Sequence, residues 1–316
     1  MKYKHVFLLF LLLPASFCSV HAQDTTDLMS QLEKEVSSDD QVNYITAAFK
    51  TTRLINGHTI ENVAKGVLDV KISHRFGTIG GTDGGAYNLF GLDNATMRMG
   101  LDYGINRYLM VGIGRSTYKK TYDAFFKIKL LRQSTGKRNM PITLSYVPTI
   151  AIKTAPKPPE GRKNYFSSKL SFTHQLIIGR KFSDATSIQL MPSVVHNNLA
   201  EFSGDPNNLF AIGIGGRQKL SKRISLNIEY YYQLPGYKLL EKKDPSSGII
   251  TRKASINSLS VGFDIETGGH VFQLHFTNSR AMNESGFIAE TTDEWNKGHI
   301  SFGFNISRVF TIGKNK

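Results

Sequence analysis

Long segments of alternating polar and apolar residues recur in this chain from residue 66 to its C-terminal end, and they constrain its fold more than any other feature. In ATMRMGLDYGI, Met97, Met99 and Leu101 share one face of an extended strand, whereas Arg98 and Asp102 share the other. Side chains alternate across a strand, so one face is apolar and the other is wet and charged. The pattern predicts an all-β protein.

The predicted strands are unusually long. A tilted strand needs about 9 to 11 residues to cross a bilayer, whereas ordinary strands average nearer 5 or 6. We therefore predict a single antiparallel, up-and-down transmembrane β-barrel of about twelve strands, with ten to fourteen open. The predicted strands are residues 66–76, 96–105, 108–117, 121–132, 141–153, 167–181, 187–196, 209–219, 224–234, 256–266, 270–279 and 299–310.

The connections between these strands alternate in length. Short turns at 105–107, 182–187, 221–223 and 267–269 alternate with long, Gly-, Asn- and Pro-rich loops. Outer-membrane barrels have short periplasmic turns and longer outer loops, whereas a soluble sandwich has no reason to sort its loops. Two connections break the rule: the tight YKKTY turn and the longer QSTGKRNM turn. A soluble sandwich stays the alternative, since it also shows strands of period two.

In a barrel the polar face of each strand points into the lumen. In KISHRFG, Lys71 and Arg75 lie on the polar face, and His74 lies on the opposite, lipid-side face. Charges would be costly in a dry core unless they were paired, so a wall that carries several of them is expected to face water. The candidate lumen-facing residues are Lys71, Arg75, Arg98, Asp102, Lys127 and Lys129.

The N-terminal part of the chain differs from the strands. Residues 1–22 have a basic start, a short apolar run and small residues before Gln23, which predicts an export signal. Residues 23–62 form a segment that would lie in the periplasm, plug the lumen or add strands, with a hairpin at Asn56-Gly57. The barrel itself is expected over residues 63–316. Without Lys2 and Lys4, the +14 net charge falls to +12.

Basic excess in an exported protein favours outer-membrane lipids, lipopolysaccharide or a small anionic solute as partners, and not nucleic acid. Tyr103, Tyr108 and Phe182 lie near strand ends, where interfacial aromatics are common. The aromatic Phe310 near the C-terminus resembles the signal that outer-membrane assembly machinery reads. The expected location is the outer membrane of a Gram-negative-type cell.

KISHRFG, LFGLDNATMRMGLDYGI, VGIGRSTYKKTYD and KLLRQ together resemble an uncharacterised family of bacterial outer-membrane β-barrel-like proteins, a domain of unknown function. The resemblance covers the chain from about Ala48 to its end and implies a barrel without an assigned activity. It also implies a lumenal charge network or a solute site. The shared polar residues map to His74, Asp93, Arg115, Ser116, Asp123, Arg132 and Gln133, besides Arg75, Arg98 and Asp102.

No motif for chemistry stands out. Ser171 and His174 have opposite parity on one strand and cannot meet, although a nucleophile and its base must come within about 3 Å. The His residues follow no zinc motif, and we expect neither a metal nor another cofactor. Three function classes follow: a channel or transporter for small, anionic solutes; a structural or assembly partner with no open pore; and a lipid-modifying enzyme, which the sequence favours least.

Overall fold

The computed structural model describes residues 41–81, 84–155, 163, 165–202, 204–243, 247–268 and 270–312. The predicted export signal and residues 23–40 lie outside the described residues. From Val42 onward the chain forms one compact unit. Within the described part, no helix is long and apolar enough to cross a membrane.

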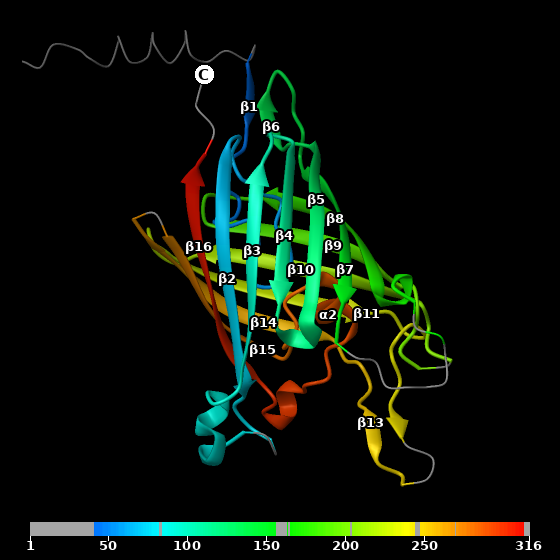
Figure 1. Cartoon of the computed structure of the whole chain (residues 1–316). Helices are drawn as coiled ribbons and strands as arrows, with labels where there is room; N and C mark the ends of the chain where they lie inside the picture. The colour runs from blue at the N-terminus through cyan, green and yellow to red at the C-terminus, as the bar shows by residue number, and fades with distance from the viewer. Residues whose placement is uncertain are drawn as a thin grey trace, which may run out of the picture. The chain divides into compact units, whose positions relative to one another are not determined.

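Twelve antiparallel strands form a closed barrel, in which each strand pairs with its neighbour in sequence and β16 closes onto β2 (Figure 1). In chain order the strands are β2 (Val67–Thr78), β3 (Ala95–Gly104), β4 (Leu109–Ser116), β5 (Thr121–Leu131), β7 (Thr143–Lys153), β8 (Leu170–Lys181), β9 (Thr186–Asn197), β10 (Asn208–Lys219), β11 (Ile224–Gln233), β14 (Ser258–Thr267), β15 (His270–Thr277) and β16 (Ser301–Thr311). All twelve predicted strands are present, and a sandwich is excluded because the sheet closes on itself.

The two faces of the strands are arranged as the alternation predicts. Met99 and Leu101 are 55% and 42% exposed on the outer surface, while Arg98 and Asp102, from the same strand, are 2% and 0% exposed. On β14, Phe263 points outward and Asp264 is buried. The apolar band therefore lies outside and the charged residues lie inside, which is the arrangement of a barrel in lipid.

The two ends of the barrel differ. The short turns lie at one end, which we call the short-turn end, and the long loops lie at the other, the long-loop end (Figure 1). The long QSTGKRNM turn forms β6 (Ser134–Gly136), which pairs with the short strand β1 (Val42–Tyr44). This explains the second exception to loop sorting: the QSTGKRNM turn is long because it binds the segment that leads into the barrel. The other exception, the tight YKKTY turn, lies at the long-loop end.

The loops at the long-loop end carry short elements. These are the 3-10 helices η1 (Ala86–Gly91), η2 (Tyr118–Lys120), η3 (Ser167–Lys169) and η4 (Trp295–Lys297), the hairpin strands β12 (Lys242–Lys243) and β13 (Ile250–Arg252), and the helix α2 (Glu284–Ala289). The six residues of α2 are all buried, because the loop between β15 and β16 folds into the barrel.

Residues 45–64, which we call the plug, enter the barrel, and residues 48–60 lie inside it. Side chains from opposite walls bind it: Lys127 of β5, Glu229 of β11 and Asn305 of β16 all contact plug backbone groups. Its tip is the predicted Asn56-Gly57 turn, closed by the Leu54 N–H donating to the Gly57 carbonyl at 2.8 Å. A single Arg53–His58 bridge replaces the two expected strands, because wall side chains take the backbone groups that a longer hairpin would pair.

The inner wall is not polar all round. We expected a small and polar inner face, yet Val147, Ile177, Met191 and Val195 on β7 to β9 point inward and are buried. They form a core with Leu54 and Ile60 of the plug. Gly215 on β10 leaves room for this contact, since a Cβ atom there would lie 2.6 Å from the Leu54 Cδ2 atom. The expectation was wrong on this side because the plug, and not water, covers the wall.

Candidate functional site

The tip of the plug wraps around one buried carboxylate. The backbone N–H groups of Ile55, Asn56 and Gly57 donate to Glu229, with N···O distances of 3.2, 2.9 and 3.1 Å. Consecutive N–H groups that converge in this way form a cradle for an anion. A buried carboxylate is costly unless it accepts hydrogen bonds, so Glu229 and the tip stabilise each other.

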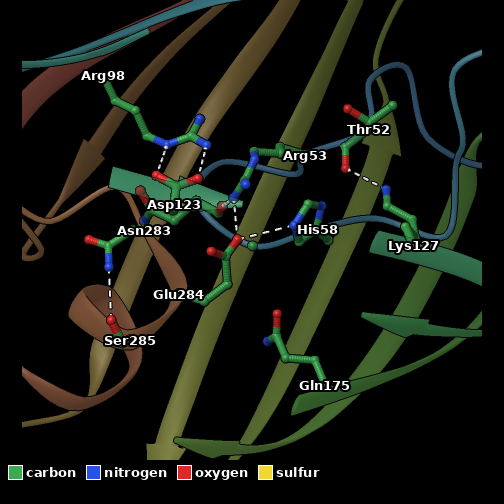
Figure 2. A network of polar contacts seen from close by, with 12 residues as sticks. Thr52, Arg53, His58, Arg98, Asp123, Lys127, Gln175, Asn283, Glu284 and Ser285 are labelled. Atoms are coloured by element: carbon green, nitrogen blue, oxygen red, sulfur yellow. Dashed lines mark hydrogen bonds and ion pairs between the residues drawn. The ribbon is translucent and has the colours of Figure 1, made fainter. Parts of the chain in front are cut away.

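A buried ammonium fixes both arms of the plug. The Nζ atom of Lys127 donates to the carbonyls of Thr52, Thr59 and Glu61 at 3.1, 3.1 and 2.7 Å. Figure 2 shows the contact between Lys127 and Thr52. An ammonium has three donors, and here each finds a carbonyl on the plug. Lys127 therefore joins residues before and after the tip.

The plug meets α2 at a buried charge cluster (Figure 2). The Arg53 Nη1 atom lies 2.6 Å from Glu284 Oε1, and the His58 Nε2 atom lies 3.1 Å from the same oxygen. Arg53 also donates to the Asn56 carbonyl at 2.8 Å. The plug enters from the short-turn end and α2 from the long-loop end, so this cluster is where the two insertions contact each other.

The environment fixes the charges of this cluster. Burial, together with the nearby Arg53 charge, lowers the pKa of His58 to about 3, so the imidazole is neutral at pH 7. Burial alone would raise the pKa of Glu284, but Arg53 and His58 outweigh it and hold this pKa well below its usual range. Arg53 and Glu284 thus form an ion pair with a neutral imidazole beside it.

A second group of charges lies on the wall next to this cluster. Arg98 binds Asp123 through two nitrogens, with an Nε–Oδ1 distance of 2.9 Å, and Figure 2 shows both contacts. Lys71 pairs with Asp102 and lies 2.9 Å from Asp69. The buried charged residues on the described strands comprise five basic and five acidic residues: Lys71, Arg75, Arg98, Lys127, Arg217, Asp69, Asp102, Asp123, Glu229 and Asp264.

A cavity remains on one side of the plug. It has a volume of about 440 Å³ and lies between the plug and the short-turn ends of β14, β15, β16 and β2. Lys50, Glu61, Asp69 and Glu266 contribute charged groups to its lining. Lys50 and Glu266 bridge the plug and the wall with an Nζ–Oε2 distance of 2.5 Å. The lumen thus has at this end a vestibule lined by both charged and apolar residues.

The candidate lumen-facing residues mostly contact the plug or one another. Lys71, Arg75, Arg98, Asp102 and Lys127 are buried on the inner face, whereas Lys129 is half-buried toward the short-turn end. The Arg75 Nη2 atom donates to the Asn56 side-chain oxygen at 2.7 Å. We expected these charges to face water, but in this structure protein groups cover them.

The comparison with protein families decides what kind of chain this is. A family model described as a membrane-bound beta barrel domain, DUF5777, matches residues 49–310, which include most of the plug and the whole barrel. The chain belongs to the DUF5777 family. A search among curated proteins finds no matching sequence.

Several solved barrels are similar to this DUF5777 chain at low sequence identity. The NanC porin is 7% identical, with a TM-score of 0.46, and the alignment covers 76% of this chain and 98% of the porin. An outer membrane channel from Pseudomonas putida F1 is 12% identical, with a TM-score of 0.46 and coverages of 79% and 98%. LpxR from Salmonella typhimurium is 9% identical, with a TM-score of 0.36 and coverages of 77% and 99%.

The other family-like polar positions are only partly in the lumenal network. Ser116, Asp123 and Gln133 are buried. The interpretation as a single lumenal network is wrong for Asp93, Arg115 and Arg132, whereas His74 lies on the lipid-side face that its strand parity predicts. By strand parity His74 lies outside, stacked on Phe304 with ring centroids 5.1 Å apart, and Arg115 lies outside against Tyr122. Asp93 is exposed in the loop after β2, and Arg132 is half-buried over Tyr44 at the short-turn end.

Four central residues of the DUF5777 chain were missed from sequence: Arg53, His58, Glu229 and Glu284. Arg53, His58 and Glu284 lie in segments without period-two alternation, so strand parity could not predict that their side chains point into the lumen. Glu229 carried a usable signal, because in ISLNIEYYY it shares the inward face of its strand with Ser225 and Asn227.

The predicted failure of Ser171 and His174 to meet agrees with the structure. Ser171 is buried 3.1 Å from the Ser285 hydroxyl, while His174 lies outside, 2.7 Å from the Tyr146 hydroxyl. Within the described ranges, no three His, Cys, Asp or Glu side chains gather closely enough to hold a metal ion.

Proposed function

We propose that this protein is an outer-membrane barrel that passes small solutes when the plug leaves the lumen. The observation that carries the proposal is that a charged inner wall is covered by a separate segment of the chain, the plug, which binds it through side-chain contacts. Lys127, Glu229 and Arg75 bind groups of the plug through hydrogen bonds and not through covalent bonds. Once the plug leaves, the same wall would line an aqueous path.

The vestibule supports this proposal. A cavity of about 440 Å³ already reaches from the short-turn end to the side of the plug. Among the described residues, the plug and α2 lie between this space and the long-loop end. A barrel with a purely structural role would gain no stability from this space, since packing contacts are lost wherever volume is left unfilled.

The outer membrane is the proposed location, with the short turns on the periplasmic side. The predicted export signal, the aromatic Phe310 in β16 and the sorting of loops by length support it. Assembly machinery of the outer membrane and its lipids are the proposed partners.

The wall charge does not favour anions. The five basic and five acidic buried residues of the strands balance, so the +12 excess lies elsewhere on the chain. We therefore broaden the solute class to small polar molecules of either sign.

The test uses two readouts on the same full chain. Arg53 is a trypsin site that is 5% exposed in the plug, so its cleavage reports plug release. We expect wild type in planar bilayers to resist cleavage at Arg53 and to conduct rarely. The double variant K127M/E229Q weakens two wall anchors that each make three hydrogen bonds to plug backbone groups. It should become cleavable at Arg53 and open frequently.

The matched control is R308Q, which removes a charge from the outer surface near the short-turn end. It should behave as wild type in both readouts. Cleavage at Arg53 without conductance in K127M/E229Q would reject the channel and favour the second candidate.

That second candidate is a structural or assembly partner with no open pore. The apolar contact of Leu54 and Ile60 with the β7–β10 wall favours it, because this core would be exposed whenever the plug moved. A lipid-modifying enzyme has no comparable support, since Ser171 and His174 lie on opposite faces of the wall. We propose that the protein is not an enzyme.

A further inference from the structure

The outer surface of the barrel has a hollow over β3, β4, β5 and β7. Its floor is Ala124, a small outward residue that pairs with Ile113 on one side and Ile150 on the other. The hollow has a volume of about 500 Å³, and an adjoining hollow of about 240 Å³ shares the same three residues. Together they form an apolar groove on the outward face.

A positive charge lies at one end of this groove. Arg115 is exposed on the outer face of β4, one residue before the strand ends at the long-loop end. Its Nε atom donates to the Tyr122 hydroxyl at 3.2 Å, and its guanidinium lies 5.5 Å from the centre of that ring. Tyr122 therefore fixes the side chain while the two terminal nitrogens stay on the surface. Among the described residues, no carboxylate is paired with Arg115.

The spacing suits a lipid that has both a phosphate and acyl chains. Ile113 and Ala124 lie two residues deeper than Arg115 and Tyr122, which is about 7 Å along a strand. A charged side chain on the outer face of a barrel costs little free energy only near the membrane–water interface, where the lipid head groups lie. The turn beyond it, η2, adds exposed Lys120.

We infer that this groove binds lipopolysaccharide, with a lipid A phosphate on Arg115 and an acyl chain over Ala124. The guanidinium matches a phosphate in charge and in its forked geometry. The choice of lipopolysaccharide over a phospholipid rests on the proposed location, because the long-loop end would then face the outer leaflet. The apolar groove over Ala124 and the charge of Arg115 do not depend on the proposed location.

The experiment measures lipid A binding to the purified full chain by native mass spectrometry in detergent. The variants are R115Q, R115K and A124F, with R308Q as the matched control at the opposite end of the outer surface. A heat-modifiability gel checks that each variant is folded. We expect R115Q to weaken binding about tenfold, the effect of losing one charge-assisted hydrogen bond. R115K should retain part of the affinity, and A124F should weaken binding by filling the groove.

Dephosphorylated lipid A should bind wild type as weakly as intact lipid A binds R115Q. Equal losses in R115Q and R308Q would overturn the site, as would full binding of the dephosphorylated lipid. Phosphatidylglycerol binding as tightly as lipid A, with the same loss in R115Q, would overturn the choice of lipopolysaccharide. None of these variants touches the plug, so Arg53 cleavage and conductance test the channel separately.

Discussion

Arg53 of the plug and Glu284 of α2 form an ion pair inside the barrel, with an Nη1–Oε1 distance of 2.6 Å. The two residues are 231 positions apart in sequence and reach the same point from opposite ends of the barrel. Each is expensive to bury alone, since an unpaired charge in a protein interior costs several kcal/mol. The plug and α2 therefore stabilise each other, and a change in one is expected to be felt by the other.

Substituting one partner of this pair should destabilise the barrel strongly. E284Q leaves the Arg53 charge buried without its counter-ion, which costs about 3–5 kcal/mol when a buried pair is broken. The measurement is denaturant unfolding of the full chain in detergent, followed by the fluorescence of the single Trp295.

Two further variants test whether the buried charge causes this loss of stability. R53L/E284L removes both charges and should recover part of the lost stability, because apolar replacements of a buried pair are often neutral. E294Q breaks a surface pair with Lys297 and should change nothing measurable. If R53L/E284L were less stable than E284Q, the buried charge would not be the cause.

Acid should destabilise the plug through His58. Its pKa is about 3 in the folded chain, against 6.5 for an unperturbed histidine, so only the unfolded chain takes up this proton between those values. Stability therefore falls as pH drops below about 6.5, by about 1.4 kcal/mol for each pH unit at most. Glu284 acts in the same direction at lower pH, because its folded pKa is also lowered and its stabilisation is lost on protonation.

The check is unfolding of wild type and H58Q at several pH values between 7 and 5. H58Q should start less stable and lose less on acidification. If the stabilities of the two proteins fell in parallel as the pH dropped, His58 would take up no more protons in the unfolded chain than in the folded chain.

Sequence alone located the wall well because alternation is a local signal. Residues 224–234 were predicted and Ile224–Gln233 form the strand, and the parity of Arg98 and Met99 held throughout. Plugging of the lumen was one of the alternatives left open for residues 23–62, but the contacts that hold the plug were beyond this reasoning. In the cradle, Gly57 contacts Glu229, which is 172 positions away in sequence. No local sequence pattern predicts such a contact. Arg115 shows the limit on the surface: the family resemblance implied a lumenal charge network for it, yet it is exposed on the outer face of β4.

The tip of the plug should tolerate no side chain at residue 57. A Cβ atom on Gly57 would lie 2.1 Å from the Tyr231 hydroxyl oxygen, so G57A must push the tip away from Glu229. We expect a loss of about 1–3 kcal/mol, as for overpacking in a core, and faster trypsin cleavage at Arg53.

The double variant G57A/Y231F removes the clashing hydroxyl and should restore much of the protection against trypsin. G268A is the control, because a Cβ atom on Gly268 meets nothing within 4 Å. Cleavage in G57A at the wild-type rate would mean that the tip does not depend on this close approach.

Single charges on the wall should control ion preference once the plug is displaced. Arg217 and Asp264 are both buried on the inner face, and Arg217 binds the plug through the Ala48 carbonyl at 3.2 Å. In the K127M/E229Q background, R217Q should shift the reversal potential in a KCl gradient toward cations. D264N should shift it toward anions, because fixed wall charges concentrate the opposite ion in a narrow path. R308Q, outside the barrel, should leave the potential unchanged. Shifts of the same sign in R217Q and D264N would mean that the current does not pass through this lumen.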